Sequence, residues 1–231
     1  MKEVNSYGWK AVIGSSIGYA MDGFDLLILG FMLTLISGDL GLTTGQAGSL
    51  VTWTLVGAVI GGFIFGTLSD KFGRVRVLTW TIVLFAVFTG LCAFAQGYWD
   101  LLIYRTIAGI GLGGEFGIGM ALAAEAWPAQ HRAKATSYVA IGWQLGVLAA
   151  ALLTPVLLPY IGWRGMFMVG IIPAFVAWFF RAKLHEPEIF VQSKEIKEHS
   201  HTNSFKLLVK DVRTTKTSIG VAILTSVQNF G

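Results

Sequence analysis

Charged residues are scarce in this chain, and cysteine is almost absent. Only 13% of the 231 residues are Asp, Glu, Lys or Arg, about half the share of roughly 25% in a soluble globular domain. This shortage argues against a soluble enzyme or nucleic-acid-binding domain, which would need a larger charged surface. The single cysteine, Cys92, excludes an internal disulfide. Apolar residues instead make up 54% of the chain, and the mean hydropathy is +0.66.

The apolar residues are concentrated in six segments, each long enough to cross the roughly 30 Å hydrocarbon core of a bilayer. Lipid offers no hydrogen bonds to the backbone, so segments this apolar are predicted to be helical. A further apolar segment begins near residue 217 and is too short to span within this sequence. The six complete segments cover residues 11–37, 46–68, 77–96, 99–123, 136–158 and 163–180.

The order of these segments divides the chain into three parts. We predict a six-helix transmembrane bundle over residues 1–182, a cytoplasmic central loop over 183–216 and a truncated seventh helix over 217–231. The central loop mixes basic and acidic residues with few apolar ones, as expected of a linker at the membrane surface. The predicted fold class is therefore all-α, in a polytopic membrane protein.

The basic residues predict how the spans are oriented. All but two of the 17 Lys and Arg residues lie at the N-terminus, in the loops after the second and fourth segments, or after the sixth. The exceptions are Arg164, on the opposite side, and Arg105, inside the fourth segment. Cytoplasmic loops carry the excess of Lys and Arg, so we expect a multi-pass protein of the plasma (inner) membrane with a cytoplasmic N-terminus. The net charge of +4 thus reflects orientation and does not predict a nucleic-acid partner.

Four ionisable residues lie inside the apolar segments: Asp22, Asp25, Arg105 and Glu115. Each costs about 2.5–3.5 kcal/mol in the bilayer and is therefore a functional candidate. The two aspartates share one helix face, and the helical rise puts them and Arg105 at similar depths near mid-membrane. We expect an ion pair there. It is either purely structural, or a proton site on one of two close carboxylates, or an arginine that binds an anionic substrate.

Other polar groups in the spans also have both functional and structural interpretations. Glu115 lies nearer the cytoplasmic edge, where it either snorkels or caps a loop, or takes part in gating or coupling. Trp143 and Gln144 stand inside the fifth segment. An indole and an amide at mid-span suit a substrate-lining role, and hydrogen bonding between helices explains them equally well.

Glycine is abundant and recurs at a spacing of four residues, which lets helices in a membrane approach closely. The run that follows Arg105, G-x-G-x-G-G, is not interpreted as a dinucleotide-binding loop, because no strand precedes it. The pair His199 and His201 has metal-ligand spacing, but a solvated loop explains it better. Neither a metal nor a cofactor is predicted.

Four motifs resemble those of a known family. The loop Gly66-Thr67-Leu68-Ser69-Asp70-Lys71-Phe72-Gly73-Arg74-Val75-Arg76 resembles the G-x-L-[SA]-D-[RK]-x-G-R-[RK] loop of the major facilitator superfamily. The motif Arg105-x-x-x-Gly109-x-Gly111 is similar to its R-x-x-x-G-x-G element, and the stretch from Glu125 to Arg132 is similar to its E-x6-R element. The first segment carries Asp22-Gly23-Phe24-Asp25, which resembles the D-G-[FY]-D signature of aromatic-acid and sialic-acid proton symporters.

This resemblance implies a twelve-helix transporter built from two six-helix halves, each a 3+3 inverted repeat. The chain would supply the N-terminal half, with the lipid bilayer around it and a C-terminal six-helix half as its partner. The implied function is proton-coupled uptake of a small organic anion, of the aromatic-acid, sialate or lactate type, by alternating access. In the family the matching residues form a cytoplasmic gate: Gly66, Asp70, Gly73, Arg74, Arg76, Glu125 and Arg132.

Departures from the family pattern keep other functions open. Position 75 is Val where the family often has a basic residue, and the stretch from His185 to Ile189 only partly matches the P-E-S-P-R of sugar porters. The partial match counts against a plain sugar carrier. A carrier of a sugar or another polar metabolite remains an alternative, as does a membrane receptor or scaffold that has lost transport. No span offers a catalytic Ser/His or His/Glu cluster, so an enzyme is not expected.

Overall fold

The computed structural model describes residues 6–181, Glu186 and Lys216, and all regular elements there are helical. Five of the helices are long and apolar enough to cross a membrane. The predicted seventh helix and most of the predicted central loop lie outside the described residues. The elements are α1 (Ser6–Leu40), α2 (Thr44–Phe72), α3 (Arg74–Cys92), α4 (Tyr98–Glu125), the short 3₁₀ helix η1 (Ala129–His131) and α5 (Arg132–Arg181).

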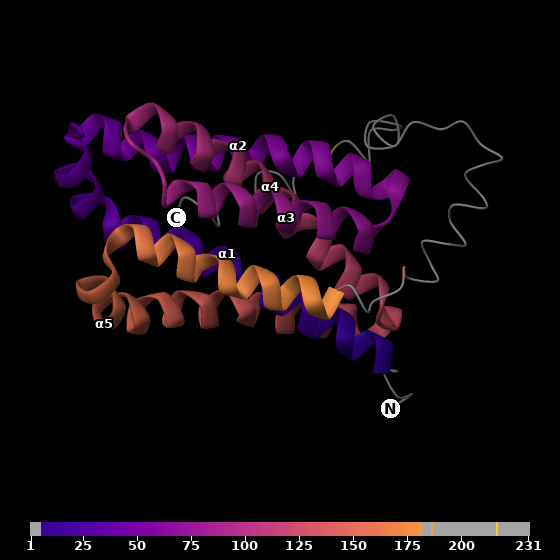
Figure 1. Ribbon diagram of the computed structural model, residues 1–231. Coiled ribbons are helices and arrows are strands. Elements are labelled where there is room, and N and C mark those ends of the chain that lie inside the picture. The colour runs from indigo at the N-terminus through magenta and orange to yellow at the C-terminus, as the bar shows by residue number, and fades with distance from the viewer. Residues whose placement is uncertain (1–5, 182–185, 187–215, 217–231) are drawn as a thin grey trace. The chain divides into compact units, whose positions relative to one another are not determined.

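Helix α5 contains the fifth and the sixth predicted segments. Its 50 residues are helical except at Gly162, where φ is +63° and ψ is 179°. A positive φ of this size favours glycine, and the chain turns back at this point (Figure 1). The segments predicted at 136–158 and 163–180 lie on either side of the break, so they are two separate spans. The other four predicted segments correspond to α1–α4, although α3 already ends at Cys92.

Local sequence accounts for where the second and third helices begin. The hydroxyl of Thr43 accepts a hydrogen bond from the backbone N–H of Gln46, and the side chain of Gln46 accepts one from the N–H of Thr43. This capping box satisfies N–H groups that have no partner within α2. At the other end of α2, the single residue Gly73 connects it to α3 with φ at +111°. Only glycine adopts this angle easily.

Glycines bring the helices together in two close pairs, α1 with α5 and α2 with α4 (Figure 1). If spans 1–3 and 4–6 are repeats, span 1 corresponds to span 4 and span 2 corresponds to span 5. The pair of α1 with the fifth span, in α5, is then equivalent to the pair of α4 with α2. The packing is thus the one expected of a 3+3 repeat. A Cβ atom would overlap the backbone of the partner helix at Gly57, Gly61, Gly109, Gly113, Gly142 and Gly146.

Large apolar side chains remain on the outside of the helices. Phe63 is 64% exposed and Leu152 is 61% exposed, whereas Ile28 and Phe167 are fully buried in the core between the helices. A water-soluble protein rarely leaves so much apolar surface in contact with water, but the hydrocarbon of a bilayer covers it. The chain is therefore a multi-pass membrane protein.

One set of polar contacts ties three helix ends together on the side predicted to face outward. Arg164 pairs with Asp39 near the end of α1, and it donates to the carbonyl oxygen of Ala95, just after α3, at 3.1 Å. The indole nitrogen of Trp163 also donates to Asp39, at 3.1 Å. We call this set the outer clasp. It holds the ends of α1 and α3 against the start of the sixth span.

We expect Gly113→Ala to destabilise the bundle and Gly117→Ala, on the same helix, to be tolerated. A Cβ atom at Gly113 would overlap the backbone of Ala58 on α2, whereas nothing lies within 4 Å of one at Gly117. Overpacking of this kind costs about 1–3 kcal/mol. In detergent, the unfolding temperature should fall by several degrees for Gly113→Ala only. Equal unfolding temperatures would contradict the close packing of α2 on α4.

Candidate functional site

The ion pair expected near mid-membrane forms between Arg105 of α4 and Asp25 of α1. The two Nη atoms of Arg105 donate to the two carboxylate oxygens of Asp25, at 3.0 and 2.7 Å. Their side chains are 0% and 1% exposed. Two parallel hydrogen bonds between ionised groups are a strong and specific arrangement for an arginine and a carboxylate. A buried charge at this depth needs such a partner, because lipid does not solvate it.

Residues of α3 and α5 also lie next to the pair. The guanidinium carbon of Arg105 lies 5.8 Å from the ring centre of Phe167 on α5. The buried thiol of Cys92, near the end of α3, also interacts with Arg105 and donates to the carbonyl oxygen of Phe88 at 3.2 Å. Residues of α1, α3, α4 and α5 therefore meet around one cation.

The second aspartate of the motif is buried as well. Asp22 lies three residues before Asp25 on α1 and is 0% exposed. It is close enough to Tyr19 to act on it electrostatically. The structure thus places both aspartates in the interior and joins Asp25 to Arg105.

This geometry sets what the pair can do chemically. Asp25 accepts one N–H from each Nη atom of Arg105, so a second carboxylate cannot form these same two hydrogen bonds while the pair is closed. A proton on Asp25 would remove its charge and leave the buried guanidinium unbalanced, which is unfavourable in a medium of low polarity. A carboxylate from outside the protein would restore the balance. In chemical terms, the arrangement is able to exchange one carboxylate for another on a fixed cation.

Glu115 lies inside the packing of α4 against α3 and is 1% exposed, so it does not snorkel to the membrane edge. The hydroxyl oxygen of Thr81 is 3.4 Å from Oε2 of Glu115 and 2.9 Å from the carbonyl oxygen of Leu78. The carbonyl oxygen of Leu78 and the ionised carboxylate of Glu115 are both acceptors, and the hydroxyl of Thr81 has only one hydrogen to donate. Thr81 therefore solvates the carboxylate only in part.

Trp143 belongs to a group of aromatic rings from three helices. Its ring centre is 6.0 Å from that of Tyr19 on α1, which in turn is 4.7 Å from that of Phe116 on α4. Trp143 is half-buried and Gln144 is exposed. Within residues 6–181, neither side chain makes a hydrogen bond to another helix.

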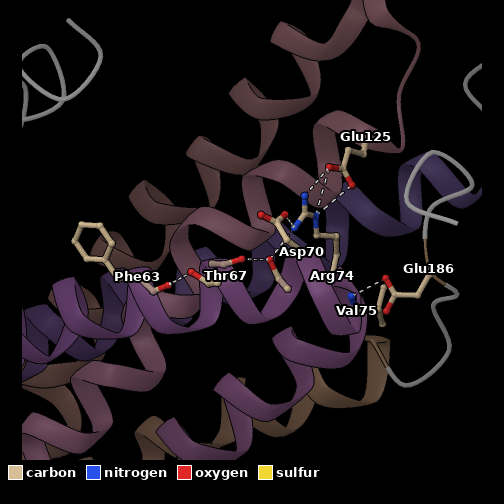
Figure 2. Close-up of polar contacts among 9 residues, drawn as sticks. Phe63, Thr67, Asp70, Arg74, Val75, Glu125 and Glu186 are labelled. Carbon is tan, nitrogen blue, oxygen red and sulfur yellow. Dashed lines mark hydrogen bonds and ion pairs between the residues drawn. The ribbon is translucent and has the colours of Figure 1, made fainter. Parts of the chain in front are cut away.

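At the end predicted to be cytoplasmic, Arg74 connects α2, α3 and α4 (Figure 2). Its guanidinium pairs with Asp70, donates to the hydroxyl of Ser69 at 2.8 Å and reaches the carboxylate of Glu125 at 3.2 Å. Its side chain is only 16% exposed. We call Asp70, Arg74 and Glu125 the gate cluster. Residues predicted from two separate motifs meet in it.

The other predicted gate residues do not bind the gate cluster through their side chains. Arg76 and Arg132 are exposed, and neither forms an ion pair within the described part of the chain. Gly66 accepts a hydrogen bond from Ser69 through its carbonyl oxygen at 2.8 Å, and a Cβ atom there would meet open space. Glu125 is engaged by Arg74 and not by Arg132.

One residue at this end, Glu186, is not among the predicted gate residues. Its carboxylate accepts a hydrogen bond from the backbone N–H of Val75 at 3.2 Å (Figure 2). It accepts a second one from the backbone N–H of Arg76 at 3.1 Å. A separation of 110 residues from Arg76 leaves no periodic signal in the sequence. The available hint is that α3 follows Gly73 and has no capping side chain of its own.

No cluster of three or more His, Cys, Asp or Glu side chains that could hold a metal ion occurs among the residues that the structure describes. His199 and His201 lie outside those residues.

The chain belongs to the Major Facilitator Superfamily, which it matches over residues 15–230. Over 99% of its length it is 76% identical to a Haemophilus influenzae protein described as "Putative metabolite transport protein", of which it covers 58%. It is 33% identical over 84% of its length to the sialic acid transporter NanX of Escherichia coli, of which it covers 48%. It is 32% identical over 99% of its length to the cis,cis-muconate transport protein of Acinetobacter baylyi, of which it covers 56%. The chain thus spans about half the length of these relatives, which are described as transport proteins and not as enzymes.

A solved structure shows the same fold. The Escherichia coli xylose transporter XylE, in a partially occluded inward-open conformation, matches 84% of this chain with 52% of its own. The TM-score is 0.74 and the sequence identity is 24%. At this identity the likeness concerns the helical arrangement alone.

We expect Asp25→Asn to destabilise the protein far more than Asp39→Asn. Asp25→Asn leaves Arg105 buried without its counter-charge, which costs about 3–5 kcal/mol. Asp39→Asn breaks an exposed pair of the outer clasp, and exposed pairs contribute little. The double variant Asp25→Asn/Arg105→Gln should recover part of the loss, because the unpaired charge is gone. Unfolding temperatures measure all three effects. An Asp25→Asn protein as stable as Asp39→Asn would show that the buried pair does not hold the helices together.

Proposed function

We propose that this chain is the N-terminal half of a transporter that moves a small organic anion across the membrane together with protons. The observation that carries the proposal is the buried, two-fold hydrogen-bonded pair of Arg105 and Asp25. Membership in the superfamily supports transport, and relatives named for sialic acid and muconate support a carboxylate as substrate.

The coupling follows from the need to keep one buried cation balanced. With Asp25 ionised, the pair with Arg105 is closed and no substrate is bound. When Asp25 takes up a proton, both Nη atoms of Arg105 become available, and a substrate carboxylate forms the same two hydrogen bonds. When the substrate leaves, Asp25 loses its proton and pairs again. Each binding event thus takes up one anion and one proton, and Asp22 offers a second proton acceptor one turn away.

Residues around the pair are proposed to complete the site. Trp143 and Gln144 would line the substrate, since one is half-buried beside Tyr19 and the other is exposed towards the surface of this half. Glu115 would take part in coupling, because it is buried on α4 between Arg105 and Glu125. No resident cofactor or metal enters this scheme.

The gate cluster is proposed to close the cytoplasmic side. Opposite charges on α2, α3 and α4 can pair in one conformation and separate in another, as alternating access requires. Arg76 and Arg132, both exposed near the same end, would then pair with the second half. This end also carries the basic loops, so we propose that it faces the cytoplasm of a cell bounded by the plasma (inner) membrane, with the N-terminus inside.

Transport is tested by reconstituting the chain with the remaining part of its Haemophilus influenzae relative, the two 76% identical over the shared region. We expect proteoliposomes with an acidic exterior to accumulate labelled benzoate, sialate or lactate, and a protonophore to abolish accumulation. Xylose is the comparison substrate. Accumulation of xylose alone would favour a sugar carrier. Substrate binding without uptake of any compound would favour a receptor.

We expect Asp25→Asn to abolish accumulation driven by the proton gradient and to preserve exchange of labelled for unlabelled substrate. Asparagine resembles the protonated acid, so Arg105 stays available to a carboxylate, whereas no proton can be released. Asp39→Asn, in the exposed outer clasp, is the control and should leave both activities intact. If uptake ignores the pH gradient and Asp25→Asn leaves it unchanged, proton symport through Asp25 is wrong.

A further inference from the structure

Helix α3 begins immediately after Gly73 and lacks a cap of its own. The first four N–H groups of an α-helix have no acceptor within the helix. A side chain just before the helix usually supplies one. Gly73 has no side chain, and no side-chain cap bond is formed from this position. The N–H groups of Val75 and Arg76 therefore need an acceptor from elsewhere.

Glu186 supplies that acceptor from the segment that follows the sixth span. One carboxylate oxygen accepts a hydrogen bond from the N–H of Val75 (Figure 2), and the other accepts one from the N–H of Arg76. A carboxylate at the N-terminus of a helix is also favoured by the helix dipole. The contact therefore combines two hydrogen bonds with a favourable charge interaction.

The residue before the helix is shaped to admit this carboxylate. Gly73 has φ at +111°, where other residues are strained, and a Cβ atom there would lie only 2.5 Å from the carboxylate carbon of Glu186. Any side chain at position 73 would thus displace Glu186. The glycine serves two purposes: it makes the turn between α2 and α3, and it leaves room for an acid more than a hundred residues away.

The same first turn of α3 carries the arginine of the gate cluster. Arg74 stands between Gly73 and Val75, and its guanidinium bridges Asp70 and Glu125. Three carboxylates thus surround the start of α3. The backbone N–H groups of α3 bind Glu186, so the guanidinium of Arg74 binds the other two acids, Asp70 and Glu125. Fixing the first turn therefore fixes the point from which Arg74 reaches α2 and α4.

We propose that Glu186 is a positioning residue of the cytoplasmic gate, by which the segment after the sixth span holds the start of α3 and so aligns Arg74. The gate itself rests on the proposed function. The capping contact does not, and it can be measured without any substrate.

The contact is tested by amide hydrogen exchange at residue resolution on the purified chain. Glu186→Ala should speed exchange at Val75 and Arg76 by about fivefold, the loss expected for removal of a helix cap. The amide of Val77, which donates to the carbonyl oxygen of Gly73 at 3.3 Å, is the internal reference and should change much less. Glu188→Gln is the control variant for a general charge effect, and Gly73→Ala should reproduce Glu186→Ala. Unchanged exchange in Glu186→Ala, equal acceleration at all three amides, or the same effect from Glu188→Gln would overturn the proposal.

The link to the gate is tested in the reconstituted two-part transporter. If Glu186 acts through Arg74, then Glu186→Ala should lower uptake in the normal background and add little to Arg74→Ala, so the two effects are not additive. Glu186→Asp should restore part of the uptake. Fully additive effects would show that Glu186 acts elsewhere. A protein that transports nothing but shows the expected exchange pattern would refute the proposed function and leave the capping role intact.

Discussion

The structure depends on one buried ion pair. Arg105 and Asp25 lie 80 residues apart in sequence and are joined by two parallel hydrogen bonds at almost no exposure. Neither charge is tolerable alone at this depth, so α1 and α4 must be in register along their axes and turned to face each other. The glycine contacts that pack α1 on α5 and α2 on α4 have to be compatible with that register, because they allow no sliding without overlap. The ion pair thus sets how α1 and α4 are aligned, and the glycines set how closely the helices pack.

The two ends of the bundle use charge differently. At the end predicted to face outward, one arginine, Arg164, meets one acid, Asp39, in an exposed pair to which Trp163 also donates. At the end predicted to be cytoplasmic, a single arginine, Arg74, bridges two acids, and a third acid, Glu186, is bound by backbone amides. A one-to-one pair with an indole partner suits a fixed junction. In the gate cluster and its surroundings, several acids share one cation and one helix end. Breaking one contact costs less there, because the released carboxylate has another hydrogen-bond donor nearby. This difference is consistent with the proposed gate at the predicted cytoplasmic end.

The spans and the mid-membrane pair can be predicted from the sequence for the same reason. In lipid, a polar group without a partner is unfavourable. Long apolar segments therefore mark the spans, and the few charged residues inside them mark the pair. The helical rise puts Asp22, Asp25 and Arg105 at one depth, but it cannot choose between the aspartates, because that choice depends on how α1 is rotated. The loop motif identifies Asp70 and Arg74, and the stretch from Glu125 to Arg132 identifies Glu125. Neither motif reveals that Arg132 stays exposed, because Arg74 already engages Glu125. The contact of Glu186 with α3 cannot be predicted from the sequence. Its partners are backbone N–H groups, which are the same in almost every residue.

The four ionisable groups inside the spans are buried by residues of this chain alone. None of these groups is more than 1% exposed, so residues of this chain shield them without a second half: Asp22, Asp25, Arg105 and Glu115. Under the proposed function, a substrate carboxylate replaces Asp25 on Arg105 only after Asp25 is protonated, so the unloaded protein keeps its buried cation balanced. The pairing that balances the charge would then also make binding depend on a proton. In that proposal, stability and coupling are two consequences of one interaction, and weakening the pair to improve one is expected to damage the other.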